Sequence, residues 1–170
     1  MAPDLTVPSR TTVDTQLGPF TAVVGPAGVV ATAFGEEDAR HLPESREAGR
    51  ELAAVRREVA AYFAGRLRAF ETPADLSPLG DGFVRRTLEV VRTIPYGELW
   101  TYGDVAAAAG APRGGRAAGT ALARCPIELF VPCHRVVRAG PSLGRYGRHD
   151  DRRRFLLALE GALPGLPRGA

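Results

Sequence analysis

Two residues that could perform nucleophilic chemistry are adjacent in this chain, Cys133 and His134. A cysteine attacks as its thiolate, and because the ordinary thiol pKa is about 8.5, a nearby base must accept its proton at neutral pH. Histidine is such a base, and the positive charge of Arg135 would favour the thiolate. The pattern therefore predicts an activated cysteine, with an ordinary buried cysteine beside a surface histidine as the alternative.

The residues around this pair predict how the backbone holds it. Apolar residues 129–131 precede the pair and Val136–Val137 follow it, so we expect two buried extended segments. Neighbouring side chains on a strand point to opposite faces, so His134 can reach Cys133 only through an irregular backbone or a bridging water. Pro132, which has no N–H to donate, favours an irregular backbone at that position.

Charge is distributed unevenly along the 170 residues, although the net charge is only +3. Residues 1–100 contain 11 arginines and 14 acidic residues, whereas residues 101–170 contain 11 arginines and 5 acidic residues. The basic part is the one that contains Cys133. It suits a polyanionic partner such as nucleic acid, and an arginine-rich solvated surface is the alternative.

Several classes of protein are not expected. The first residues lack a signal-peptide layout and no apolar run approaches 18 residues, so we expect a soluble, cytoplasmic protein without membrane contact. Two cysteines are too few for a disulfide framework. A structural zinc site needs four ligands, and His41 is the only histidine or cysteine before residue 125, so we predict no metal.

The N-terminal part has strand patterns. Short β-branched runs at residues 11–15, 20–25 and 28–34 are separated by glycine and proline turns, which predicts an antiparallel meander. Apolar residues at three- and four-residue steps then predict a helix over residues 44–68. Acidic residues here are scattered, and we find no catalytic constellation among them.

The C-terminal part has helix patterns. After an irregular linker at residues 71–81 we expect a helix over 82–93, a turn at 94–97, and helices over 102–109 and 115–124. The last two, joined by a glycine-containing turn, predict a helix-turn-helix. A final helix over 150–160 begins with two acids, and Arg152–Arg154 in it form a basic cluster that could meet phosphates.

Four blocks of this part resemble the O6-alkylguanine-DNA alkyltransferases, in the family's order and at its intervals. They are Arg116–Gly119, Pro132–Val137, Gly144–Gly147 and Leu156–Gly161. The resemblance implies an α+β protein with a small ribonuclease-H-like, antiparallel β domain at residues 1–80. A mainly helical DNA-binding domain with a helix-turn-helix would follow at residues 81–163. We expect a disordered tail at residues 164–170.

The resemblance also implies roles for individual residues. The second helix of the helix-turn-helix would enter the minor groove, with Arg116 replacing a flipped-out base; its small residues could instead serve tight core packing. Tyr102 would rotate the target phosphate, or be an ordinary half-buried tyrosine. Glu160 would orient His134 rather than be a surface acid. The implied substrate- or DNA-binding residues are Tyr102, Arg116, Ala117, Gly119, Arg135, Val136, Tyr146 and Gly147.

Cys125 departs from the family, which usually has asparagine there as a hinge. Because cysteine is a weak hydrogen-bond donor and acceptor, we expect a looser hinge. If Cys125 lies close to Cys133, the two thiols could also oxidise to a disulfide, which requires Cα atoms within about 7 Å.

The predicted function is direct reversal of DNA damage. The alkyl group of O6-alkylguanine, and also of O4-alkylthymine, would pass irreversibly to Cys133, with Cys133, His134 and Glu160 as catalytic residues. We expect a monomer acting once on double-stranded DNA, without a cofactor. The alternatives are a non-catalytic protein that flags alkylguanine for another repair pathway and, less favoured, a cysteine hydrolase, which would turn over.

Overall fold

The computed structural model describes residues 7–140 and 149–163, and the chain divides into two compact units. The first unit comprises the residues up to Asp75 together with Pro126–Phe130, and the second comprises Leu76–Cys125 and the residues from Val131 onward. The expected α+β class is confirmed. The domain boundaries stay a prediction, because compact packing alone does not show that a segment folds independently. Tyr146, Gly147 and the tail at 164–170 lie outside the described residues.

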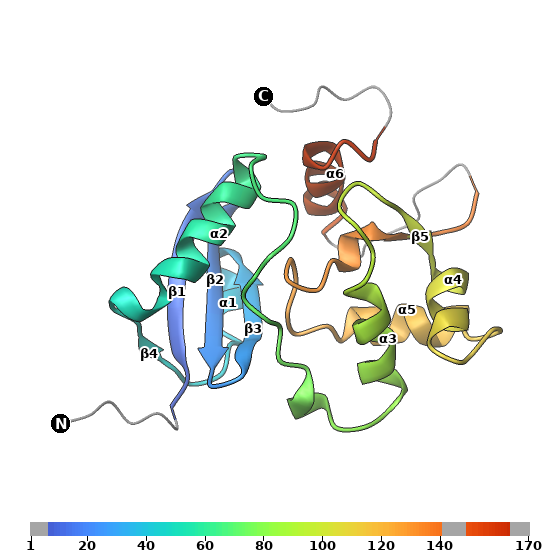
Figure 1. Cartoon of the computed structure of the whole chain (residues 1–170), viewed down its shortest axis with the longest axis horizontal. Coiled ribbons are helices and arrows are strands. Elements are labelled where there is room, and N and C mark those ends of the chain that lie inside the picture. The colour runs from blue at the N-terminus through green and yellow to red at the C-terminus, as the bar shows by residue number, and fades with distance from the viewer. Residues whose placement is uncertain (1–6, 141–148, 164–170) are drawn as a thin grey trace. The chain divides into compact units, whose positions relative to one another are not determined.

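The first unit is built on a four-stranded sheet (Figure 1). Strands β1 (Ser9–Thr15), β2 (Gly18–Gly25) and β3 (Gly28–Phe34) form the expected antiparallel meander. A short strand β4 (Arg46–Glu47) then pairs with β1 in parallel, giving the order β3-β2-β1-β4. The sheet is therefore mixed, and the expectation of a purely antiparallel domain was wrong for β4.

The turn between β2 and β3 requires glycine at position 28. Gly28 has a φ of +135°, and a Cβ there would overlap the carbonyl oxygen of Pro73. That carbonyl accepts a hydrogen bond of 2.8 Å from the N–H of Val29. The close approach thus lets the chain near Pro73 pair with the first residues of β3 at the edge of the sheet.

The helix expected over residues 44–68 is much shorter in the structure. Helix α2 covers Ala53–Phe63, after a 3₁₀ turn η1 (Arg50–Leu52). A separate helix α1, which the sequence patterns did not predict, covers Gly35–Ala39. The apolar periodicity predicted the buried face correctly, because Val55, Val59, Tyr62 and Phe63 are buried. Pairing of Arg46–Glu47 with β1 overrides helix propensity on the N-terminal side, as tertiary contacts often do.

Aromatic rings fill the core of the first unit. Phe20 contacts Phe34 edge-on with ring centroids 4.8 Å apart, and Phe130 lies 4.3 Å from Phe70 and 6.5 Å from Phe20. Phe130 belongs to the segment Pro126–Phe130, which joins this core between two stretches of the second unit. The core is therefore completed by a segment that ends three residues before Cys133.

Leu129 in this segment has an unusual backbone. It is the one non-glycine residue with a positive φ, +76°, in the part of the chain that the structure describes. A left-handed conformation costs an L-residue about 1–2 kcal/mol. Leu129 is 3% exposed, so burial of its side chain, worth about 1.5–3 kcal/mol, offsets that cost.

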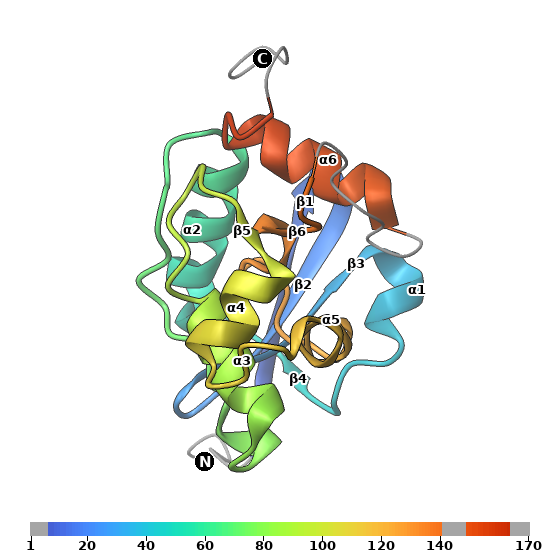
Figure 2. The ribbon, with the colours of Figure 1, turned by 90° about the vertical axis from the view of Figure 1, so that its right-hand side faces the viewer.

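The second unit gathers helices around one another (Figure 2). After a 3₁₀ turn η2 (Ser77–Leu79) come α3 (Phe83–Val91), α4 (Tyr102–Ala108) and α5 (Gly115–Ala123), which contact one another as expected for the helix-turn-helix and its supporting helix. The last helix, α6, covers Asp150–Leu159. No helix among the described residues is long and apolar enough to span a membrane.

Helix α4 begins with a capping box formed by Thr101 and Asp104. The Thr101 hydroxyl accepts a hydrogen bond of 3.1 Å from the Asp104 N–H, and the Asp104 carboxylate accepts one of 2.9 Å from the Thr101 N–H. The hydrogen bonds from Thr101 lower the pKa of Asp104 below its ordinary value.

Loss of this cap should be measurable. Thr101→Ala should lower the free energy of unfolding by about 1 kcal/mol, because an N-cap hydroxyl is worth that much, and urea denaturation would measure it. Thr120→Ala is the matched control. It removes an exposed hydroxyl from the interior of α5 and should be neutral or slightly stabilising, so an equal loss in both variants would contradict the capping role.

Candidate active site

Cys133 and His134 lie on a tight turn rather than on a strand. The segment Cys133–Arg135 is a single 3₁₀ turn, η3, and the strand β6 (Val136–Val137) begins only after it. The Cys133 N–H donates to the carbonyl of Val131 at 2.8 Å. The irregular backbone that we expected from Pro132 is confirmed, whereas the extended segment expected before the pair is absent. Cys133 is 2% exposed and His134 1% exposed.

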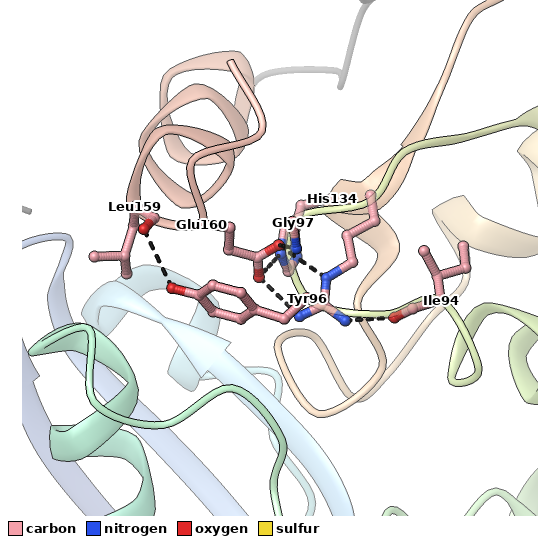
Figure 3. Close-up of polar contacts among 7 residues, drawn as sticks. Ile94, Tyr96, Gly97, His134, Leu159 and Glu160 are labelled. Atoms are coloured by element: carbon pink, nitrogen blue, oxygen red, sulfur yellow. Dashed lines mark hydrogen bonds and ion pairs between the residues drawn. The ribbon is translucent and has the colours of Figure 1, made fainter. Parts of the chain in front are cut away.

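The Glu160 carboxylate is paired with the two basic residues that follow Cys133 in the chain (Figure 3). His134 Nε2 lies 2.8 Å from Glu160 Oε1, and the Arg135 guanidinium donates through Nη2 to Oε1 at 2.8 Å and through Nε to Oε2 at 2.9 Å. Glu160 follows the last residue of α6, and its side chain is fully buried. The contact between Glu160 and His134, implied by resemblance, is thus present in the structure.

The turn at residues 94–97 completes the surroundings of this carboxylate. The Gly97 N–H donates to Glu160 Oε2 at 3.2 Å, and the Tyr96 hydroxyl donates to the carbonyl of Leu159 at 3.2 Å (Figure 3). Arg135 Nη1 donates to the carbonyl of Ile94 at 2.6 Å. We had assigned this turn no role in the site. Its Pro-Tyr-Gly sequence signalled a turn but not the partner that the turn would touch.

The hydrogen bonds decide the ionisation of Glu160. Burial by itself would raise the pKa of the carboxyl, but hydrogen bonds and charge from His134 and Arg135 outweigh it and hold the pKa far below its ordinary value. Glu160 is therefore a carboxylate at neutral pH and can only accept hydrogen bonds. It follows that His134 Nε2 carries a proton, which leaves Nδ1 as the basic nitrogen of a neutral ring.

Two residues predicted to bind substrate or DNA are buried in the structure. Arg135 is buried by its ion pair with Glu160, and its guanidinium also lies 5.8 Å from the centre of the Tyr96 ring. Val136 is fully buried and pairs with Trp100 of the short strand β5 (Trp100–Thr101). In this geometry Arg135 supports Glu160, and neither side chain faces solvent.

Three of the residues predicted to meet DNA share one pocket. Tyr102 at the start of α4, and Arg116 and Gly119 of α5, line a cavity of about 900 Å³. A Cβ at Gly119 would lie 3.8 Å from the Tyr102 ring, so the bare flank of α5 does admit a close neighbour. The remaining lining residues are Thr101, Gly103, Gly115, Arg138, Ala139, Asp150 and Arg154. Three arginines give this pocket a basic character.

Tyr102 lines the pocket and also interacts electrostatically with Cys133. Parallel pairing of β5 with β6 places the start of α4 beside the residue that follows β6, whereas η3 directly precedes that strand. Burial raises the pKa of the Tyr102 phenol, Arg153 and Arg138 oppose that rise, and Cys133 and Asp150 add to it. The phenol therefore lies within electrostatic reach of Cys133.

The comparisons with known proteins agree with this geometry. Residues 82–162 match the family model described as "6-O-methylguanine DNA methyltransferase, DNA binding domain". A methylated-DNA–protein-cysteine methyltransferase from Methanosarcina barkeri is 33% identical over 156 residues, covering 83% of this chain and 96% of that protein. The chain belongs to the methylated-DNA–protein-cysteine methyltransferases. This is a family of DNA-repair enzymes.

Further members of the methyltransferase family support the assignment. The one from Mycolicibacterium paratuberculosis is 45% identical over 111 residues, and that alignment spans 65% of this chain and 66% of the relative. The crystal structure of the Mycobacterium tuberculosis O6-methylguanine methyltransferase superposes with a TM-score of 0.76 at 33% identity, covering 94% of this chain and 95% of that one. The M. tuberculosis protein in complex with DNA gives 0.78 at 34% identity, covering 91% and 93%.

The small residues of α5 serve two purposes, tight packing within the helical unit and access to the pocket, which the sequence gave as alternatives. Ala118 and Ala121 are buried, so they serve tight packing within the helical unit. Arg116 and Ala117 are exposed, and Gly115, Arg116 and Gly119 line the pocket. Packing and access to the pocket thus belong to different sides of one helix.

Arg153 corrects our expectation of an exposed basic cluster on the last helix. It is 1% exposed, on the same face of α6 as Leu156, Leu157 and Glu160, whereas Arg154 is exposed and lines the pocket. The sequence Arg152–Arg154 gave no sign that the middle residue would be inside, because burial of arginine is rare.

Cys125 and Cys133 are not joined in a disulfide in the structure. Cys125 is partly exposed just beyond α5, and its N–H donates to the carbonyl of Leu122 at 3.0 Å. The looser hinge and the reversible disulfide stay hypotheses. Among residues 7–140 and 149–163, no group of three or more His, Cys, Asp or Glu side chains is arranged to hold a metal ion.

Proposed function

We propose that this methyltransferase takes the methyl group from O6-methylguanine in double-stranded DNA onto Cys133, once per molecule. The observation that supports the proposal most directly is the buried array in which Glu160 orients His134 immediately beside Cys133. Cys133 would be the nucleophile, His134 the general base and Glu160 the group that fixes the ring.

The proposed reaction balances without a cofactor. His134 Nδ1 accepts the thiol proton, directly or through a water, and the thiolate of Cys133 attacks the methyl carbon. The bond between that carbon and O6 breaks as the new carbon–sulfur bond forms, and the electron pair passes into the guanine ring. Guanine regains a proton at N1, so the proton lost by the thiol is replaced on the product. The thioether does not hydrolyse, which makes each molecule act once.

Access to the base requires that it leave the stack, because Cys133 is buried and O6 of a paired guanine lies within the duplex. The basic pocket beside Tyr102 would receive the flipped nucleotide, while α5 lies in the minor groove with Arg116 in the vacated position. We infer that the protein acts as a monomer and accepts O4-alkylthymine through the same pocket.

Intact-protein mass spectrometry tests the proposal. After incubation with a duplex that contains one O6-methylguanine, the wild type should gain the mass of one methyl group, and excess DNA should add no second. Cys133→Ala should gain none. Lesion-selective binding without added mass would overturn the proposal in favour of a non-catalytic sensor, and release of the alkyl group with turnover would favour a hydrolase.

A further inference from the structure

The segment that leads into Cys133 is held by the sheet of the first unit. Its residues Pro126–Phe130 belong to that unit, and Ile127, Leu129 and Phe130 are buried in it. Phe130 packs between the rings of Phe20 and Phe70. The anchored segment ends at Phe130, and Cys133 follows three residues later.

Thr32 supplies hydrogen bonds that hold the segment Pro126–Phe130 to the sheet. Its N–H donates to the carbonyl of Pro126 at 2.8 Å, and its hydroxyl donates to the carbonyl of Glu128 at 3.1 Å. Thr32 lies on β3, which is the edge strand of the sheet, so its outward main-chain group is available for such pairing. One residue therefore fixes two carbonyls that lie two positions apart.

These two hydrogen bonds come immediately before the strained residue. Leu129, with its φ of +76°, directly follows Glu128 and precedes the packed ring of Phe130. A non-glycine residue keeps such a conformation only when the structure on both sides determines it. After Leu129 the chain soon turns again, because the Cys133 N–H donates to the carbonyl of Val131, two residues earlier.

We propose that Thr32 is a positioning residue for Cys133. Its paired hydrogen bonds hold the left-handed turn at Leu129 and so fix the direction in which the chain enters η3. The expected effect on the rate of methyl transfer rests on the proposed function. The expected effect on the conformation of residues 129–133 does not, and it can be measured without DNA.

Thr32→Val tests the proposal, because valine keeps the branched shape and the main-chain N–H but removes the hydroxyl. Thr12→Val is the matched control, because the Thr12 hydroxyl lies 2.9 Å from the hydroxyl of Thr21 on β2, within the sheet rather than on the segment before Cys133. We expect Thr32→Val to slow single-turnover methyl transfer about tenfold while DNA affinity changes less than twofold, and Thr12→Val to change neither.

Two measurements without DNA separate this proposal from the proposed function. Amide hydrogen exchange should become faster at residues 129–133 in Thr32→Val only, and the rate of Cys133 carboxamidomethylation by iodoacetamide, read by peptide mass, should change in that variant only. If the wild type transfers no methyl group, the proposed function fails while these two readouts still test Thr32. Equal exchange and equal thiol reactivity in the two folded variants would overturn the positioning role.

Discussion

Replacing Glu160 by glutamine should slow methyl transfer by about 100-fold or more, the usual contribution of a correctly oriented general base. The glutamine amide is neutral and can present N–H to its neighbours, so it no longer fixes His134 with its proton on Nε2. It also leaves the buried Arg135 guanidinium without its charge partner. Single-turnover kinetics on O6-methylguanine DNA would measure the loss.

The same substitution should lower the free energy of unfolding by about 3–5 kcal/mol, because one member of a buried ion pair is removed. Glu89→Gln is the matched control, since Glu89 is an exposed acid that pairs with Arg85 on the surface of α3. A surface pair contributes about 0–1 kcal/mol. Equal losses in the two variants would show that the Glu160 cluster does not stabilise the fold.

The difference in the free energy of unfolding between wild type and Glu160→Gln should depend on pH, because the pKa of Glu160 is lowered in the folded protein. The pKa of Glu160 in the folded protein lies below the ordinary value of about 4.3, so its ionised form stabilises the fold fully above that ordinary value. The contribution is lost as the pH falls toward the folded-state pKa. The stability difference between wild type and Glu160→Gln should therefore be constant from about pH 6 to 8 and shrink below pH 4 in urea titrations.

Patterns in the sequence predicted the elements that carry their own periodicity. The β-branched runs correspond to β1 to β3, and the apolar residues at three- and four-residue steps correspond to the buried face of α2. The Thr101 cap is equally local, because a capping box depends on residues three positions apart. Such features are encoded within a few residues and need no knowledge of the fold.

The elements that the sequence did not predict depend on contacts between distant residues. Arg46 pairs with Ser9, and Arg153 is buried by packing of a whole helix, so neither result follows from its neighbours. The same holds in the candidate site. Resemblance supplied the contact between Glu160 and His134, but the turn at Tyr96–Gly97 meets α6 across more than sixty residues of sequence. Residue type alone could not reveal that contact.

Gly97→Ala should damage both stability and methyl transfer, because position 97 meets two demands at once. Gly97 has a φ of +81°, where alanine is strained by about 1–2 kcal/mol, and a Cβ there would lie 3.1 Å from the Glu160 carbonyl oxygen. Relief of that contact would move the Gly97 N–H away from Glu160 Oε2. We expect the free energy of unfolding to fall by about 2–3 kcal/mol, since a further 1 kcal/mol accompanies a lost hydrogen bond.

Gly65→Ala separates the two demands. Gly65 has a φ of +71° and no atom within 4 Å of the position of a Cβ. Alanine there would therefore introduce backbone strain without a steric overlap. It should cost about 1–2 kcal/mol and leave the methyl-transfer rate unchanged. Gly97→Ala should slow transfer about tenfold under conditions in which both variants are fully folded. Unchanged transfer in Gly97→Ala would mean that Arg135 and His134 hold the Glu160 carboxylate without the turn, and that Gly97 serves only the backbone.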